Sequence, residues 1–154
     1  MIRIKPSATA DTRTANGLVS KDELLKSSKQ HKKDVYKAMS FFAKKLTEAG
    51  IAHDYTKIEN ISQFHRDFCM WQKEGFDKAS KWYDMHIKTE RHHLNEHCTE
   101  DVTLIDVLER IADICMAGMS RSGKVTPDEL DVEILRKAYA NTIKLLTEQI
   151  EVEK

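Results

Sequence analysis

Hydrophobic residues recur at intervals of three and four along most of the chain, the spacing that places them on one face of an α-helix. One such series runs from Leu24 through Val35 to Leu46, and shorter series follow it. No alternating series is long enough to predict a strand. The pattern therefore predicts an all-α, single-domain bundle of about five helices, at about residues 20–50, 61–75, 77–97, 99–118 and 126–146.

Residues with known preferences at helix ends mark these boundaries. Ser20 and Glu23 form the pattern of a capping box, in which each side chain accepts a hydrogen bond from the backbone N–H of the other. The residues placed to end or begin the other helices are Gly50, Gly75, Thr99, Gly118 and Thr126-Pro127. Residues 1–19 have no helical period, which predicts a flexible N-terminal arm before a helical domain at 20–154.

The composition is that of a globular protein without a net charge. Hydrophobic residues make up 40% of the chain and charged residues 32%, and 25 lysines and arginines balance 25 acidic residues. This balance gives no general attraction to nucleic acid or to a membrane surface. The three cysteines form no CxxC pair and the first residues have no apolar signal-peptide core, which together indicate the cytoplasm.

All seven histidines lie between positions 31 and 97. At His53-Asp54 an imidazole and a carboxylate are adjacent, so both can bind one ion, and the second carboxylate oxygen can reach another ion. Lys57 follows one helical turn later, where its charge would meet a substrate phosphate; the alternative is an ordinary solvated lysine. These residues predict a metal centre with an anion site beside it.

A second cluster of histidines follows in the third predicted helix. If this segment is helical, four potential metal ligands share one face at i, i+4, i+7 and i+11: His86, Glu90, His93 and His97. His92 points to one side and can join them only if the helix breaks nearby. The alternative is a solvated charged face, which accounts for the acidic residue better than for the histidines.

Three acidic residues, Asp106, Glu109 and Asp113, recur on the fourth predicted helix. Asp113 is flanked by apolar residues, so it is the one that we expect to point inward. A buried carboxylate is stable only beside a cation or with a proton bound. The sequence therefore predicts a metal, an arginine or a bound proton at Asp113.

The order of these residues resembles the HD-domain superfamily of metal-dependent phosphohydrolases, and most closely a small, uncharacterised, phage-associated branch of it. The matching segments begin with a histidine-led helix and a His-Asp-x-x-Lys motif. An Arg-x-His-like segment and a Glu-x-x-x-Asp helix with a following glycine come next. In this sequence they are His31-Lys-Lys-Asp, His53-Asp54-x-x-Lys57, Glu90-Arg91-His92-His93, and Glu109 and Asp113 with Gly118. The resemblance covers about residues 28–123 and implies a helical, HD-domain-like bundle.

The resemblance also implies which residues hold metal. The set for one divalent ion (Mn, Mg, Fe or Zn) is His31, His53, Asp54 and Asp113. The set for a second ion is His86, His92 and His93. One departure from the family is that only 22 residues separate His31 from His53, which leaves little room for the usual extra helix.

The activity that the resemblance implies is hydrolysis of a nucleotide or another small phosphate ester by a metal-activated water. Asp54 would orient that water. Lys57, together with Arg91 or His97, would neutralise the charge that develops on the phosphoryl oxygens.

Three other interpretations remain open from the sequence. A non-catalytic, metal-containing binding module, for example in a phage–host interaction, would keep the same ligands. The segment from His93 to His97 fits H-x-x-E-H, the pattern of an inverted-motif zinc peptidase. A di-iron carboxylate bundle needs two Glu-x-x-His motifs, and only Glu90 to His93 supplies one. Assembly into a homo-oligomer is compatible with each of these interpretations.

Overall fold

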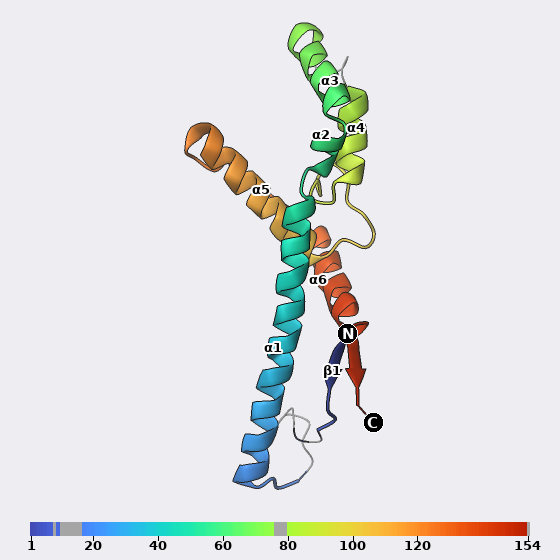
Figure 1. Ribbon diagram of the computed structural model, residues 1–154. Helices are drawn as coiled ribbons and strands as arrows, with labels where there is room; N and C mark the ends of the chain where they lie inside the picture. Colours follow the sequence, from blue (N-terminus) through green and yellow to red (C-terminus); the bar gives the residue numbers. More distant parts are fainter. Residues whose placement is uncertain (8, 10–16, 76–79, 154) are drawn as a thin grey trace. The chain divides into compact units, whose positions relative to one another are not determined.

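A computed structural model describes residues 1–7, 9, 17–75 and 80–153, and these residues are almost entirely helical (Figure 1). The all-α class is confirmed. The elements in chain order are β1 (Ile2–Ile4), α1 (Lys21–Ala52), α2 (Tyr55–Glu59), α3 (Ile61–Glu74), α4 (Ser80–Thr89), α5 (Leu104–Ser122), α6 (Val132–Thr147) and β2 (Ile150–Val152). The described residues divide into two compact units, residues 1–45 with 143–154 and residues 46–142.

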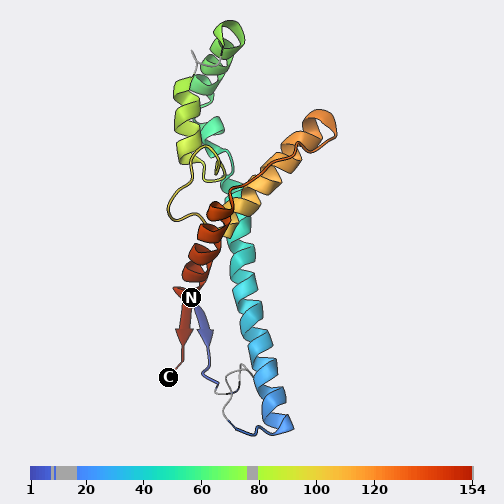
Figure 2. The same ribbon diagram turned by 180° about the vertical axis from the view of Figure 1, so that it is seen from behind.

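The first unit contains a short parallel pair of strands that the sequence did not predict. Ile2 pairs with Ile150, and the two strands lie side by side when viewed from the front and from behind (Figures 1 and 2). Lys37 of α1 donates a hydrogen bond of 2.7 Å to the carbonyl of Arg3, so β1 is held along this helix. The strand falls within the predicted N-terminal arm, of which residues 8 and 10–16 lie outside the described residues.

Helix α1 begins as predicted and ends later than predicted. The Ser20 N–H donates to the Glu23 carboxylate at 3.1 Å and the Glu23 N–H donates to Ser20 Oγ at 3.3 Å, which confirms the capping box. The helix continues through Gly50 to Ala52, because a glycine inside a helix costs only about 1 kcal/mol. The left-handed residue that ends it is Asp54, at φ 56°.

The core of the second unit lies where α5, α6 and the segment between α4 and α5 meet. The buried apolar side chains are Leu94, Val102, Val107 and Ala138. Helix α5 begins after Thr103, not Thr99, because the Asp106 carboxylate accepts the Thr103 N–H at 2.7 Å. At the start of α6 the Asp131 carboxylate accepts the Glu133 N–H at 2.7 Å, so α6 begins later than predicted from Thr126-Pro127.

Helix α5 does not end at Gly118, the glycine that the sequence predicted for its end. Gly118 lies inside the helix, where a Cβ atom would come within 2.7 Å of the Lys124 carbonyl oxygen. The helix ends instead at Gly123, whose φ of 69° is left-handed. Gly118 therefore allows the segment after α5 to approach the helix closely.

Helices α3 and α4 form a pair joined by aromatic stacking. The rings of Phe64 and Trp82 are 4.1 Å apart and nearly parallel. Helix α3 ends at Glu74 with Gly75 after it, as predicted. Helix α4 ends at Thr89, eight residues before the predicted end at His97, and the chain continues through turns to Thr103.

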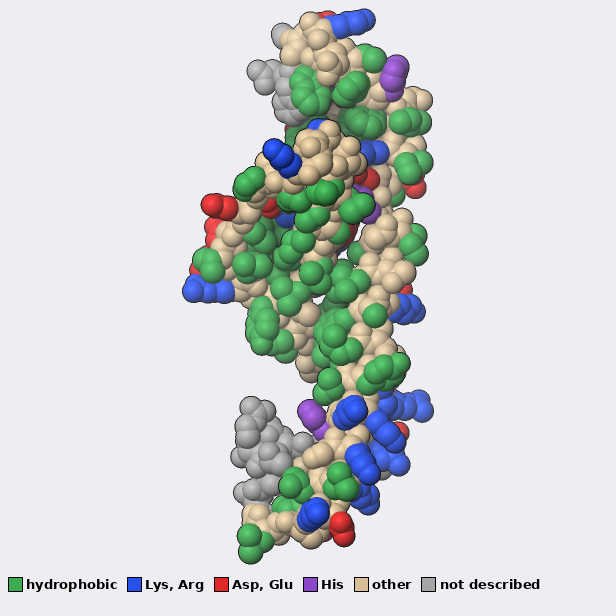
Figure 3. Space-filling model, turned by 90° about the vertical axis from the view of Figure 1, so that its left-hand side faces the viewer, with side chains coloured by type: hydrophobic (Ala, Val, Ile, Leu, Met, Phe, Trp, Pro, Cys, Tyr) green, Lys and Arg blue, Asp and Glu red, His purple; other side chains and the backbone are tan. Residues whose placement is uncertain are grey.

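Many large hydrophobic side chains of the described residues reach the surface, and Figure 3 shows how they gather on one face. Among the helices of the described part of the chain, none combines the length and apolar character needed to cross a bilayer.

Candidate metal centre

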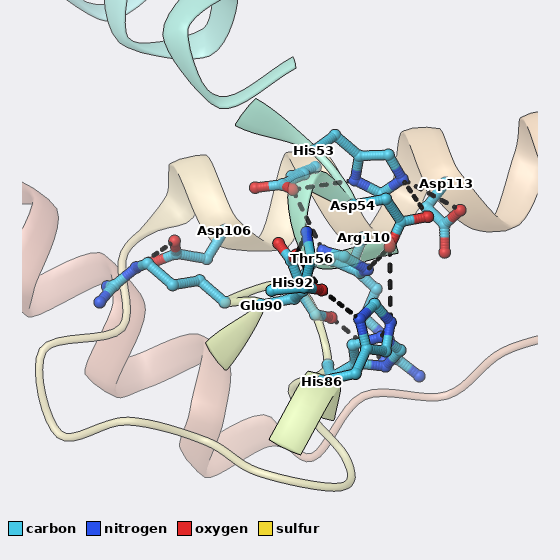
Figure 4. Close-up of polar contacts among 12 residues, drawn as sticks. His53, Asp54, Thr56, His86, Glu90, His92, Asp106, Arg110 and Asp113 are labelled. Carbon is cyan, nitrogen blue, oxygen red and sulfur yellow. Dashed lines mark hydrogen bonds and ion pairs between the residues drawn. The ribbon is translucent and has the colours of Figure 1, made fainter. Parts of the chain in front are cut away.

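Six of the seven predicted metal ligands converge in the second unit (Figure 4). Among the described residues, two groups have potential ligand atoms within 4.8 Å of one another. We call them the inner group and the outer group. The inner group is Asp54, His86, His92 and His93, and the outer group is His53, His92 and Asp113. His92 belongs to both.

The early end of α4 brings the inner histidines together. In a continuous helix, residues seven apart lie about 10 Å apart along the axis. Because the chain turns after Thr89, His93 Nε2 instead lies 2.9 Å from His86 Nε2. The same turn brings His92 into both groups. From the sequence, His92 could join the other ligands only if the helix broke nearby, and the helix does end at Thr89.

Side-chain contacts explain why α4 stops. Glu90 Oε1 accepts hydrogen bonds from the Thr56 N–H at 2.9 Å and the Thr56 hydroxyl at 2.6 Å. Arg91 Nε donates to Asp106 Oδ1 at 2.7 Å. These hydrogen bonds to α2 and α5 hold Glu90 and Arg91 in the turn that follows α4. The predicted row of ligands on one helix face therefore does not form.

Glu109 fixes the orientation of two histidine rings. Its Oε1 lies 2.9 Å from His53 Nδ1 and 3.1 Å from His92 Nδ1. An ionised carboxylate only accepts hydrogen bonds, so both Nδ1 atoms carry the proton and both Nε2 atoms present a lone pair. This arrangement of a carboxylate behind a histidine is usual at metal centres.

Thr56 does the same for His86. The Thr56 hydroxyl donates to Glu90, so it accepts a hydrogen bond of 2.7 Å from His86 Nδ1. The Trp82 ring stacks on the imidazole with centroids 4.7 Å apart. His86 Nε2 is thus left with a lone pair in a buried and fixed position.

The Asp54 carboxylate lies between the two groups. Its Oδ1 is 3.5 Å from His86 Nε2 and 3.7 Å from His92 Nε2, while its Oδ2 is 3.4 Å from His53 Nε2. These distances exceed those of ordinary hydrogen bonds. Asp54 Oδ1 and His92 Nε2 are both buried without a hydrogen-bond partner, which is rare for polar atoms inside a protein.

A divalent cation fits this arrangement. It would satisfy the two unpartnered atoms. The 2.9 Å between His86 Nε2 and His93 Nε2, a hydrogen bond without metal, is also close to the spacing of two ligands of one ion. Neighbouring ligands at about 2.1 Å from an octahedral ion are about 3.0 Å apart. Imidazole nitrogens with carboxylate oxygens suit Zn, Fe, Mn and similar metals. The buried histidine and aspartate side chains of the inner group can therefore hold a metal ion.

The outer group is more open. His53 Nε2 lies 3.4 Å from Asp113 Oδ1, and these side chains are 27% and 33% exposed. His86 and His92 are each only 2% exposed. Asp113 lies beside a potential metal-binding partner, His53, but the prediction that it points inward more than Asp106 and Glu109 is wrong. Its side chain is 33% exposed, whereas Asp106, paired with Arg91, is 6% exposed and Glu109, bonded to two histidines, is 12% exposed.

Burial and neighbouring charges set the protonation of the histidines. Burial, with the nearby His93 and Lys57, lowers the pKa of His86 to about 4. Burial and His92 also lower the pKa of His93. Burial acts in the same direction on His53, but the hydrogen bond to Glu109 and the acidic neighbours outweigh it and raise its pKa. His86 and His93 are therefore neutral at pH 7, the form that binds metal.

The carboxylates are ionised at the same pH. Burial alone would raise the pKa of Asp54, but its ion pair with Lys57 and the nearby histidines lower it. Burial is likewise outweighed at Glu109, whose pKa is lowered by its hydrogen bonds from His92 and His53. The centre thus combines the neutral imidazoles of His86 and His93 with the negative carboxylates of Asp54 and Glu109, a charge distribution that favours a cation.

His31 is the one predicted ligand that the structure does not bring into either group. Its side chain is exposed, and it lies in the first unit. Within the single helix α1, the 21 residues from His31 to Ala52 rise about 30 Å along the axis. The sequence predicted that the helix ends near Gly50, but α1 continues unbroken to Ala52. His31 is therefore not among the ligands of the inner or the outer group.

Two predicted phosphate-binding residues are also placed elsewhere. Arg91 is bound by Asp106 and by Asp101, whose Oδ1 lies 3.0 Å from its Nη1. His97 is exposed and belongs to neither group, and its segment is not helical. The H-x-x-E-H interpretation needs that helix and needs His93 and His97 at one ion, so the structure argues against it.

Lys57 lies where the sequence placed it, with its ammonium group paired to Asp54 Oδ2. Two residues that complete the centre, Thr56 and Glu109, were not predicted to have a role in it, and Glu90, predicted as a potential metal ligand, instead accepts hydrogen bonds from Thr56. Glu109 lies one helical turn before Asp113 on the same face, which was the available signal. No sequence signal marks Thr56.

Comparisons of the chain with models of protein families, with curated proteins and with solved structures find no match. The arguments below therefore rest on the residues of this chain and on their geometry.

Proposed function

We propose that the protein is a metal-dependent phosphohydrolase that acts on a small phosphate ester, with an HD-domain-like centre. The observation that carries this proposal is the position of Asp54. Its two carboxylate oxygens face different groups of ligands, and three histidines turn their unprotonated Nε2 atoms toward it. A carboxylate shared between two ions is typical of centres that hydrolyse phosphate esters.

We assign His92 to the inner ion. Its Nδ1 is committed to Glu109, so only Nε2 can bind metal, and that atom can serve one ion. The inner ion would then be held by Asp54 Oδ1, His86, His92 and His93. The outer ion would be held by His53, Asp113 and Asp54 Oδ2, which leaves more of its coordination sites open to a substrate and water.

The chain supplies a cation at the same place. Lys57 pairs with Asp54 and is 38% exposed, so its ammonium group has room to turn toward a phosphate bound at the outer ion. Divalent ions supply an acidified water and withdraw charge from phosphorus. Lys57 would add a positive charge beside the phosphoryl oxygens. Asp54 would position both ions and the ammonium group of Lys57 relative to one another.

Elemental analysis combined with phosphate release tests this function. Purified protein should retain divalent metal, and the metal-loaded protein should release phosphate from some members of a panel of nucleotides and simple phosphate esters. Asp54→Asn should lose both properties. Asp84→Asn changes an exposed aspartate outside both groups and serves as the matched control.

Two results would contradict the proposal. Unchanged metal content in Asp54→Asn would mean that the centre has been assigned to the wrong residues. Metal retained with no release from any member of the panel would favour the non-catalytic binding module.

A further inference from the structure

A groove lies directly beside the outer group. Its volume is about 400 Å³, and its walls are one face of the end of α1 and one face of α5. Residues spaced three and four apart on each helix form these faces, and all belong to the second unit. They are Leu46, Ala49, Gly50 and His53 from one side and Leu108, Glu109, Ala112, Asp113 and Met116 from the other.

The polar groups of this groove all belong to the metal centre. They are His53 and Asp113 of the outer group, and Glu109, whose Oε1 is committed to two histidines. Every other lining residue is apolar. A ligand that extends from the outer ion along the groove therefore meets apolar surface and finds no further side-chain hydrogen-bond partner in the lining.

Small residues give the groove its depth. Ala49, Gly50 and Ala112 leave room between the two helices, and a Cβ atom added at Gly50 would meet nothing within 4 Å. Larger apolar side chains stand at the rim, where Leu108 is 46% and Met116 is 70% exposed. The space suits a compact apolar group that lies against the helix backbones.

We propose that this groove binds the apolar part, an aryl or branched alkyl group, of a phosphate ester whose phosphate lies at the outer ion. This inference rests on the proposed function and narrows its substrate class. The groove continues from the ligands of the outer ion, so one molecule can occupy both. A nucleobase is a poorer occupant, because its donors and acceptors would lose water without gaining partners.

Binding of two phosphonates separates this proposal from the function on which it rests. Phenylphosphonate and methylphosphonate carry the same charged group and differ only in the part that would enter the groove. With the manganese-loaded protein, we expect phenylphosphonate to bind at least tenfold more tightly in isothermal titration calorimetry. Its binding should also have the more negative heat-capacity change, since it buries more apolar surface.

Filling the groove should remove this preference. Gly50→Leu and Ala112→Leu place a side chain in the open space, and we expect phenylphosphonate to lose its advantage while methylphosphonate binding and metal content stay unchanged. Ala140→Leu makes the same change at an exposed position of α6 outside the groove and should leave the preference intact.

Each other outcome is decisive. Equal binding of both phosphonates to the wild-type protein would overturn the groove proposal and leave the proposed function standing. Binding of neither to metal-loaded protein would overturn both. A concentration-dependent dimer in analytical ultracentrifugation that Gly50→Leu dissociates would show that a second copy of the chain occupies the groove, and this would also overturn the proposal.

Discussion

The inner and outer groups of ligands lie side by side and differ in how they are enclosed. The inner group contains His86 and His92, each 2% exposed, and His93, which is 17% exposed; the Trp82 ring and Thr56 contact His86. The outer group pairs a histidine and an aspartate that are 27% and 33% exposed and line an apolar groove. Enclosed sites usually hold a structural ion, whereas sites with an open position exchange water and substrate. The difference in enclosure suits the inner position to a structural ion and the outer position to the exchange of water and substrate.

The two groups also differ in how the chain assembles them. The inner histidines come from one short segment, and their meeting depends on where α4 ends. The outer residues His53 and Asp113 come from separate elements: His53 follows the end of α1, and Asp113 lies in the middle of α5. We therefore expect changes near residues 86–93 to act on the inner position first.

The largest expected effect is that of His92→Ala, because His92 belongs to both groups and its Nδ1 orders Glu109. We expect metal affinity to fall by at least about 100-fold, the upper end for residues that only orient a ligand, with loss at both positions. Elemental analysis and calorimetric titration with Mn²⁺ measure it. His65→Ala, at an exposed histidine of α3, is the matched control. A variant that loses metal from one position only would separate the two groups and end their common dependence on His92.

The second effect concerns acid and the metal-free protein. The pKa of His86 is lowered from 6.5 to about 4 in the folded protein. Between these pH values His86 is protonated in the unfolded chain and neutral in the folded chain. The free energy of unfolding should therefore fall between pH 6.5 and 4, by at most about 3 kcal/mol from this residue. Urea unfolding in the presence of a chelator measures it.

His53 should behave in the opposite way, since its pKa is raised. Its contribution to stability is present below pH 6.5 and is lost as the pH rises through its folded-state value. His86→Asn should therefore flatten the fall in stability between pH 6.5 and 4, whereas His53→Asn should leave that fall unchanged and remove a loss of stability that occurs as the pH rises above 6.5. Equal slopes in the two variants would mean that the two groups do not differ in protonation.

A smaller effect is expected from Glu109→Gln, which keeps the size of the side chain and removes its charge. Glu109 holds both His53 and His92, so affinity should fall at both positions, by about 10- to 100-fold. Titration with Mn²⁺ resolves the two steps. Glu129→Gln, at an exposed position away from both groups, should have no effect. Loss confined to one position would assign Glu109 to a single group.

The smallest effect is expected from Thr56→Val, which removes the hydroxyl that accepts a hydrogen bond from His86 Nδ1. We expect affinity at the inner position to fall by up to about tenfold, because the ring orientation is less restricted. The outer position should keep its affinity, since the hydrogen bonds of the Thr56 side chain go to Glu90 and His86 and not to His53 or Asp113. Equal losses at both positions would show that the groups are coupled through α2.

The sequence predicted the all-α class and six members of the two ligand groups. His53, Asp54 and Asp113 were found because their residue types and apolar neighbours are local features. The end of α4 was not predicted, because it depends on the contacts of Glu90 and Arg91 with partners on other elements. The error at His31 has the related cause that Gly50 does not end α1. Strands of three residues, held by their pairing, leave no alternating pattern to detect.

The left-handed backbone conformation of Asp54 has a cost in the free energy of unfolding. Its φ of 56° is the left-handed conformation, which costs a residue with a side chain about 1 kcal/mol relative to glycine. Asp54→Gly should therefore unfold at a higher urea concentration than Asp54→Ala in metal-free protein, although neither variant retains the carboxylate. Aspartate adopts this conformation more readily than most residues because its short polar side chain can form local hydrogen bonds, so the turn can carry a carboxylate at a small cost in stability.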